Sequence, residues 1–390
     1  MTTPIYLDGQ ASTPLAPEAQ NVLLEALSHT ANPHSSHGAG RRAHEAIETA
    51  RQSLADLIGA APAEMIFTSG ATEANNLAIQ GLARAAAALS QRRVLLTTPI
   101  EHPSVREPMK ALEAEGFEVR YAAVGSDGRL DLDAFAAAVA TGEVLLASVM
   151  AANNVTGLVQ PIKEAVALAH RHGVLFHCDA AQAGGRWALD VFDLDVDALS
   201  LSAHKMHGPP GVGALFLSAA NPLRPQPILR GGGQEAGVRS GTAPTPLIAA
   251  FGEAARLTLA RRQYDLFHLR EVVDAFLAGL EAAQIRYQIH GAPEHRMPGC
   301  LSIAFLGHDA QELTERLSET IYVSTGAACS SGRPTISPVL VAMNLPPEVA
   351  RSTLRICFTR YLTTAEAEAA AAGFAAAIAD DRIATGRLVQ

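Results

Sequence analysis

The chain has 390 residues, of which 48% are hydrophobic, and a formal net charge of −9 at pH 7. A chain of this length can bury a large core in two or three domains. The acidic balance argues against broad nucleic-acid binding, which needs a basic surface. No apolar run reaches the roughly 18–20 residues needed to span a bilayer. We therefore expect no direct nucleic-acid partner and no membrane partner.

The N-terminal segment lacks the basic region and apolar stretch of a secretory signal peptide. Four cysteines are scattered along the chain, without the spacing of a metal site or a disulfide framework. They are Cys178, Cys300, Cys329 and Cys357. We expect a reducing, cytoplasmic location and no bound metal.

Helical and strand patterns alternate from about residue 15 to residue 255. The helical patterns cover Pro17–His29, Arg41–Ile58, Glu73–Leu89, Pro103–Glu115 and Ile162–His172. The apolar strand patterns cover Met65–Thr68, Val94–Thr98, Val144–Val149, Val174–Cys178, Ala198–Ser202 and Val212–Leu217. Apolar strands separated by amphipathic helices predict an α/β fold with a mostly parallel sheet covered on both faces. The functional groups of such a sheet should cluster at the carboxyl ends of its strands.

The pattern changes after residue 251. Long helical patterns cover Glu253–Ala282 and Ala365–Ile383, and between them lie strand patterns such as Cys300–Phe305 and Thr353–Phe358. This arrangement predicts a smaller α+β domain. We expect a large domain over residues 15–255 and a small domain built from residues 1–14 and 256–390.

Two predicted strands end in residues that suit pyridoxal phosphate (PLP) chemistry. Asp179 ends one strand, and Lys205 follows a later one in the run Ser-Ala-His-Lys. A lysine amine can form a Schiff base with the cofactor aldehyde, and a carboxylate can keep the pyridine nitrogen protonated. A solvated surface lysine is the ordinary alternative. We favour a PLP site because other segments converge on the same chemistry.

A phosphate site is indicated where the strand Met65–Thr68 turns through a glycine into a helix that opens with small and hydroxylic residues. The free N–H groups and the dipole of a helix start attract anions. An ordinary helix cap at Ser69 or Thr72 would explain this segment alone. Ser202 and His204 could donate to the same phosphate. Thr242, which follows a glycine-rich cluster, is a further candidate.

Other polar residues follow strand ends or interrupt strands. His102 could stack on the cofactor and exchange protons with a substrate amine, or be a structural turn residue. Asn154 could bind the cofactor's phenolic oxygen or a substrate carboxylate, and Gln182 could bind the phenolic oxygen. Arg355 lies within a strand, where a charge needs a partner. Two interpretations of Arg355 remain open: it could bind a substrate carboxylate, or it could form an internal ion pair.

The cysteines fall into two kinds. Cys178, Cys300 and Cys357 lie in apolar strand patterns and are expected in the core. Cys329 lies in a small, polar, glycine-punctuated run that predicts a mobile loop. An exposed thiol is liable to oxidation, so we interpret Cys329 as a reactive nucleophile.

Together these segments resemble the cysteine desulfurases, in the class V aminotransferase group of fold-type I PLP enzymes. The motifs run in order along nearly the whole chain. They include Thr68-Ser-Gly-Ala-Thr-Glu73, Glu101-His-Pro103, Asn153-Asn154, Asp179-Ala-Ala-Gln182, Ser202-Ala-His-Lys205, Arg239-Ser-Gly-Thr242 and Gly326-Ala-Ala-Cys-Ser-Ser331. The last motif resembles the subgroup whose long loop hands sulfur to partner proteins.

The resemblance implies a role for each candidate residue. Lys205 would be the Schiff-base lysine, Asp179 the partner of the pyridine nitrogen, and His102 the stacking ring. The implied phosphate-binding and ring-contacting residues are Ala71, Thr72, Ser202, His204, Asn154 and Gln182, with Thr242 supplied by the second subunit of a homodimer. Arg355 would bind the substrate carboxylate, and Cys329 would be the nucleophile.

The implied reaction is PLP-dependent removal of sulfur from L-cysteine, giving L-alanine and a persulfide on Cys329. The sulfur would pass to an acceptor protein for iron–sulfur cluster, tRNA or other thio-cofactor biosynthesis. A selenocysteine lyase, a small-acid aminotransferase and a non-catalytic scaffold are the alternatives. An aminotransferase has no use for Cys329, and a scaffold would not need Lys205. Val155, Ala203 and Cys357 depart from the family's pattern without removing a proposed catalytic group.

Overall fold

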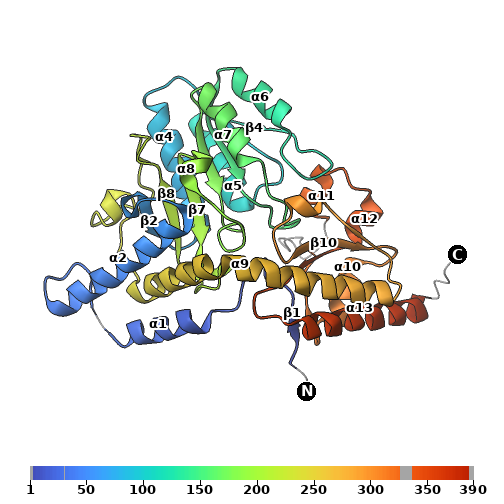
Figure 1. Ribbon diagram of the computed structural model, residues 1–390. Coiled ribbons are helices and arrows are strands. Elements are labelled where there is room, and N and C mark those ends of the chain that lie inside the picture. The colour runs from blue at the N-terminus through green and yellow to red at the C-terminus, as the bar shows by residue number, and fades with distance from the viewer. Residues whose placement is uncertain (1–2, 30, 326–335, 386–390) are drawn as a thin grey trace.

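The computed structural model describes residues 3–29, 31–325 and 336–385. Its larger body is built on a seven-stranded sheet with the order β2-β8-β7-β6-β5-β3-β4 (Figure 1). In that order the strands span Met65–Thr68, Gly213–Leu217, Ala198–Ser202, Leu175–Asp179, Val144–Met150, Val94–Thr97 and Glu118–Tyr121. Six of these seven strands lie where apolar runs predict them. The exception is β4, which is too polar to stand out as an apolar run.

The sheet is mostly parallel, as predicted, and β8 is the strand that runs against it. Strands β4, β3, β5, β6 and β7 pair in parallel, whereas β8 pairs antiparallel with both β7 and β2. The connection from β7 to β8 is short, and a short connection can join only antiparallel neighbours. Because β8 reverses twice, β2 points the same way as β7. The carboxyl ends of β2, β3, β5, β6 and β7 therefore meet at one edge.

Helices pack around this sheet. They are α1 (Pro17–Leu27), α2 (Gly38–Ile58), α3 (Ala71–Asn76), α4 (Leu82–Ala87), α5 (Pro103–Leu112), α6 (Leu132–Ala140), α7 (Ile162–Arg171) and α8 (Val191–Leu194). The single helix predicted over Glu73–Leu89 is α3 and α4 joined by a π-helical turn at Leu77–Gly81. Sequence periodicity does not reveal such a local change of hydrogen bonding.

The second body holds a three-stranded sheet, β12-β10-β9, and a two-stranded sheet, β1-β11. Its strands are β1 (Ile5–Tyr6), β9 (Tyr287–Ile289), β10 (Cys300–Phe305), β11 (Ile321–Tyr322) and β12 (Thr353–Cys357). Its helices are α10 (Ala310–Leu317), α11 (Pro338–Ala342), α12 (Pro347–Arg351) and α13 (Thr364–Thr385). The long helix α9 (Thr245–Ala282) runs beneath both bodies (Figure 1). A domain boundary near residue 255 would fall inside α9, and the division stays a prediction.

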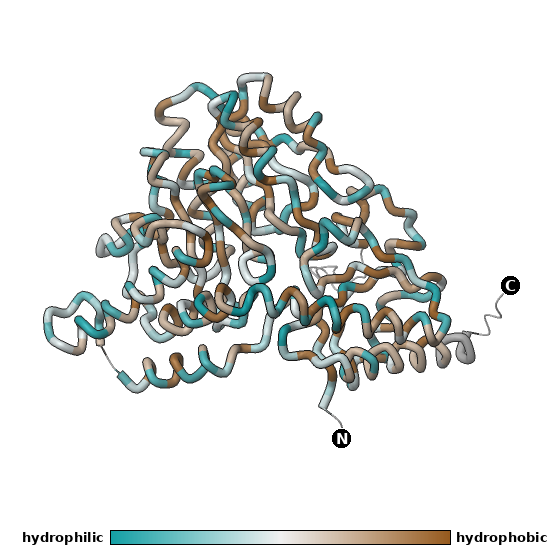
Figure 2. The backbone as a smooth tube through the Cα atoms, in the orientation of Figure 1, coloured by the Kyte–Doolittle hydropathy of each residue, from teal (hydrophilic) through white to brown (hydrophobic). Residues whose placement is uncertain are grey.

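Each body has its own hydrophobic core. One large cluster joins the main sheet to α2, α7 and the start of α9, and another joins β10, β12, the end of α9 and α13. In Figure 2 the strands of the larger body appear as brown segments, with hydrophilic positions gathered on the surrounding turns and helices. No helix in the described ranges is long and apolar enough to cross a membrane.

Candidate active site

The predicted site residues meet at the edge where the carboxyl ends of the parallel strands converge. A cavity of about 590 Å³ lies there. Ten predicted residues line it: Ala71, Thr72, His102, Asn154, Asp179, Gln182, Ser202, His204, Lys205 and Arg355. They follow β2, β3, β5, β6 and β7, with Arg355 supplied by β12 of the smaller body. Topology therefore gathers residues that are far apart in the sequence.

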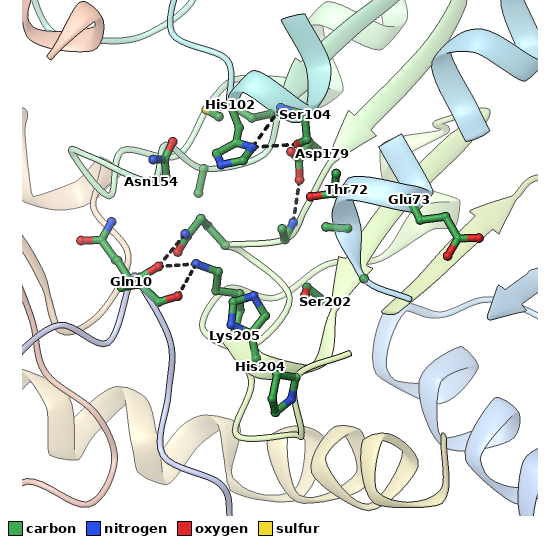
Figure 3. A pocket seen from close by; sticks show the side chains of 18 of the residues that line it. Gln10, Thr72, Glu73, His102, Ser104, Asn154, Asp179, Ser202, His204 and Lys205 are labelled. Atoms are coloured by element: carbon green, nitrogen blue, oxygen red, sulfur yellow. Dashed lines mark hydrogen bonds between the residues drawn. The ribbon is translucent and has the colours of Figure 1, made fainter. Parts of the chain in front are cut away.

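Lys205 reaches the cavity from a short 3-10 turn (Ala203–Lys205) directly after β7. Its Nζ donates to the backbone carbonyls of Gln10 and Ala11 (Figure 3). Burial, reinforced by the positive charge of Arg355, lowers the pKa of Lys205 to about 8. The amine is thus partly neutral near physiological pH, and a neutral amine is a nucleophile and a base.

Asp179 ends β6, next to the strand that carries Lys205, and its side chain is buried. Its Oδ1 accepts from the backbone N–H of Ala181 at 3.0 Å, and its Oδ2 accepts from Nδ2 of Asn75 at 2.8 Å. The carboxylate is therefore held in a fixed orientation at the cavity wall.

His102 is the N-cap of α5, and its Nδ1 accepts from the backbone N–H of Ser104 at 3.1 Å. The ring lies at the cavity wall opposite Lys205 (Figure 3). Partial desolvation and the charge of Lys205 lower the pKa of His102, against the opposing effect of Asp179. His102 therefore caps the helix, as the structural alternative predicts, and it also lines the cavity, as a ring that stacks on a cofactor would need to.

The turn after β2 forms part of the cavity wall. Gly70 has φ 146°, and the following residues Ala71 and Thr72 begin α3 at the cavity wall. A Cβ on Gly213 of β8 would lie 2.6 Å from the Cα of Gly70. The close approach of these two glycines allows the helix start, with Ser202 nearby in the cavity lining, to surround an anion.

Arg355 makes the internal ion pair that sequence reasoning left open, and it also lines the cavity. One guanidinium nitrogen lies 2.7 Å from Oδ1 of Asp8, and another donates to the carbonyl of Asn154 at 3.1 Å. Its buried Nε has no hydrogen-bond partner among the described residues. The ion pair fixes the guanidinium and leaves donor capacity for a carboxylate.

The glycine-rich cluster before Thr242 is held by ion pairs. Glu235 binds Arg51 at 2.8 Å, and Arg239 binds Glu73 at 2.8 Å. Thr242 itself is exposed and is not among the residues that line the cavity of its own chain.

The three cysteines expected in the core are buried: Cys178, Cys300 and Cys357. The predicted nucleophile, Cys329, lies outside the described residues. No group of three or more His, Cys, Asp or Glu side chains in the described ranges is arranged to hold a metal ion.

Sequence reasoning missed several residues that shape the site. Gln10 supplies a carbonyl to Lys205, and Asn75 and Ser104 support Asp179 and His102. Glu101 is buried, and burial raises its pKa to about 8 although it accepts from Thr98 and the N–H of Met150. Two signals were available in the sequence: Glu101 directly precedes His102, and Asn75 follows Thr72 by three residues.

Comparison with known proteins bears out the resemblance. The model of the family "Aminotransferase class-V" matches residues 5–369. A protein of Eremothecium gossypii named mitochondrial cysteine desulfurase is 41% identical over 369 residues, which cover 94% of this chain and 74% of the relative. The protein belongs to the class-V aminotransferase family, and within it to the cysteine desulfurases. It is therefore an enzyme of a PLP-dependent family.

Solved structures agree. A NifS-like protein has a TM-score of 0.88 and 31% identity, with 97% of this chain and all of that chain covered. The structure of SspA in complex with cysteine has a TM-score of 0.79 and 34% identity, with 92% of this chain and 99% of that chain covered. These similarities confirm the expected PLP fold type I.

The expected cytoplasmic location is wrong by the same comparison. The E. gossypii protein and other curated relatives are named mitochondrial cysteine desulfurases, which contradicts the expectation of a cytoplasmic location. Scattered free cysteines distinguish reducing from oxidising compartments. They do not distinguish one reducing compartment from another, and this is where the inference failed.

Proposed function

We propose that the protein is a PLP-dependent cysteine desulfurase that takes sulfur from L-cysteine, releases L-alanine and carries the sulfur as a persulfide on Cys329. The observation that carries the proposal is the position of Lys205 and Asp179. Asp179 ends β6 and Lys205 lies in the turn directly after the neighbouring parallel strand β7; both line one cavity, and the amine's pKa is lowered to about 8. The cysteine bound to SspA, a structural relative, supports the choice of substrate.

The cavity suits the cofactor and an amino acid together. Its volume of about 590 Å³ falls in the range of small-molecule sites. The N–H groups at Ala71 and Thr72, with Ser202 and His204, would hold the phosphate. Asp179 would hold the pyridine nitrogen, and His102 would cover the ring. Gln182 and Asn154 would contact the ring oxygen. When bound, the cofactor withdraws electrons from the substrate's Cα.

The chain's own residues supply the remaining steps. Lys205 would hold the cofactor through its amine and, when neutral, would take the proton from the substrate's Cα. The guanidinium of Arg355, fixed by Asp8, would bind the substrate carboxylate through its free donor capacity. The Cys329 thiolate would attack the substrate sulfur. The new S–S bond forms as the C–S bond breaks, and the carbon gains a proton to give alanine.

The sulfur would then pass from Cys329 to an acceptor protein. A persulfide on a loop can react with a partner's thiolate by direct transfer, without release of free sulfide. Iron–sulfur cluster assembly, tRNA thiolation and other thio-cofactor pathways are the proposed destinations.

The test is alanine formation from L-cysteine by the purified protein with PLP. Lys205→Ala should make no alanine and should change the cofactor's absorption, whereas Lys110→Ala, at an exposed lysine, should do neither. Normal turnover by Lys205→Ala would exclude the assigned lysine. A strong preference for selenocysteine over cysteine would instead show a selenocysteine lyase.

We also propose a homodimer in which Thr242 reaches the phosphate in the partner's site. Its exposed position, away from its own chain's cavity, supports this arrangement. A Lys205→Ala chain mixed with a Thr242→Ala chain would then form heterodimers with one undamaged site. Activity should be partly recovered in verified heterodimers, and no recovery would place Thr242 outside the partner's site.

A further inference from the structure

Asn75 links the two sides of the cavity through hydrogen bonds. It lies in α3 with 0% of its surface exposed. Its Nδ2 lies 2.8 Å from Oδ2 of Asp179 and 2.9 Å from Oγ of Ser104. The same Oγ lies 2.8 Å from Nδ1 of His102. A continuous chain of contacts therefore runs from Asp179 through Asn75 and Ser104 to His102.

The chemistry of these groups fixes which atom donates at each contact. The carboxylate of Asp179 accepts, so Asn75 must present its NH₂ group there rather than its oxygen. The second amide hydrogen then points at Oγ of Ser104. With that lone pair occupied, the hydroxyl hydrogen of Ser104 is directed to Nδ1 of His102. That nitrogen also faces the backbone N–H of Ser104, so it carries no hydrogen.

The amide oxygen of Asn75, Oδ1, takes no part in this series of hydrogen bonds. This oxygen is buried and has no hydrogen-bond partner among the described residues. Leaving a buried acceptor unpaired is unfavourable, and a residue kept only for packing would avoid it. The side chain's polar contacts in the described structure are both donations.

We propose that Asn75 is a positioning residue that couples His102 to Asp179 and, by directing the Ser104 hydroxyl, helps the Ser104 backbone N–H keep the single N–H of the neutral imidazole on Nε2, the nitrogen away from Ser104. The inference rests on the roles proposed above for His102 and Asp179. It adds that the stacking ring enters the reaction as an Nε2–H donor. The Nδ1 nitrogen is not free to accept a substrate proton.

The series of hydrogen bonds from Asp179 through Asn75 and Ser104 to His102, called the relay below, favours the neutral form of His102. A hydroxyl that donates to Nδ1 competes with protonation of that nitrogen. The charged and titratable groups around the ring are Asp179 at the end of β6, Lys205 after β7 and Arg106 on α5. Loss of Asn75 would free the Ser104 hydroxyl to turn away from Nδ1, so that this nitrogen would lose a donor that competes with its protonation. The pKa of His102 should then rise.

The test measures the proton on His102 directly, by NMR of the full chain with ¹⁵N-labelled histidine, with and without PLP. A His102→Gln variant assigns the signals. Asn75→Ala and Asn75→Leu both remove the donors, but the first leaves a cavity and the second nearly fills it. Asn76→Ala is the matched control, since the neighbouring Asn76 donates to the carbonyl of Thr72 and accepts from Gln80, outside the contacts that join Asp179 to His102.

We expect Nε2–H in the wild type and a rise in the pKa of His102 of about half to one unit in both Asn75 variants, the size of one hydrogen bond. Ser104→Ala should raise it similarly, and Asn75→Leu with Ser104→Ala should add nothing further. Asn76→Ala should leave it unchanged.

A proton on Nδ1 in the wild type, an unchanged pKa in both Asn75 variants, or fully additive effects with Ser104→Ala would each overturn the relay. None of these readouts needs turnover. A protein that shows the relay but makes no alanine would contradict the proposed function alone.

Discussion

At the scale of single residues, the Lys205 amine is buried beside a second positive charge, the guanidinium of Arg355. Both effects disfavour the ammonium form, and the pKa falls from its ordinary value of about 10.4 to about 8. The carbonyls of Gln10 and Ala11 hold the amine in place meanwhile. The same surroundings therefore lower the pKa of the amine and fix its position.

This lowered pKa predicts how the cofactor-free protein reacts with an aldehyde. Only neutral amines react, so labelling of Lys205 by pyridoxal should rise with pH through a midpoint of about 8 and then level off. Borohydride trapping followed by peptide mass spectrometry measures it. The exposed Lys110 is the internal control and should need a higher pH.

Arg355→Gln supplies the second arm of that experiment. It removes a positive charge and leaves Asp8 unpaired, and both changes favour the ammonium form of Lys205. The midpoint should therefore move upward, although burial, the larger cause, still holds it below the ordinary value. A wild-type midpoint already near 10 would show that burial does not activate the amine, and no response to Arg355→Gln would show that the charge of Arg355 does not contribute.

Most of the site residues that sequence reasoning found lie at or just after the end of a strand. Parallel strands bring their carboxyl ends to one edge, so Lys205, Asp179 and His102 could be placed together without a structure. Asn75 could not, because its partner Asp179 lies 104 positions away and the contact depends on how α3 packs. Hydrogen-bond networks of this kind follow from tertiary packing.

At the scale of elements, the positions of the strands were easier to predict from the sequence than the direction of each strand or the contacts between helices. Buried strands appear as apolar runs, but nothing in the run Gly213–Leu217 shows that β8 is antiparallel. The sequence likewise did not predict that α2 and α9 cross in close contact. At this crossing a Cβ on Gly252 would lie 2.4 Å from the Cα of Ala50, so glycine is required for the helices to approach.

Gly252→Ala should therefore destabilise the protein by about 1–3 kcal/mol, because the added methyl must push two packed helices apart. Gly38→Ala in α2 is the control, since its Cβ would meet only the ends of arginine side chains at 3.6 Å or more. Urea unfolding of both variants measures the difference. Equal stabilities for the two variants would show that the crossing tolerates a side chain at Gly252.

At the scale of the whole molecule, the site joins segments that the chain keeps apart. The segment from Asp8 to Ala11 binds Lys205 from one side, and β12 brings Arg355 to the same cavity. Asp8 also forms a bridge to Cys357 of β12, so these two segments support each other. The substrate's carboxylate and its reacting carbon would thus be held by different bodies of the protein.

The central claim is that Cys329 takes the sulfur, and mass spectrometry after incubation with L-cysteine tests it most directly. The wild type should gain one sulfur on the Cys329 peptide, removable by a reductant. Cys329→Ser should keep the cofactor's absorption, because the proposed cofactor ligands lie elsewhere, but form neither persulfide nor alanine. Serine lacks the polarisable thiolate that attacks sulfur. Sulfur on Cys178, Cys300 or Cys357, or full alanine release by Cys329→Ser, would contradict the account.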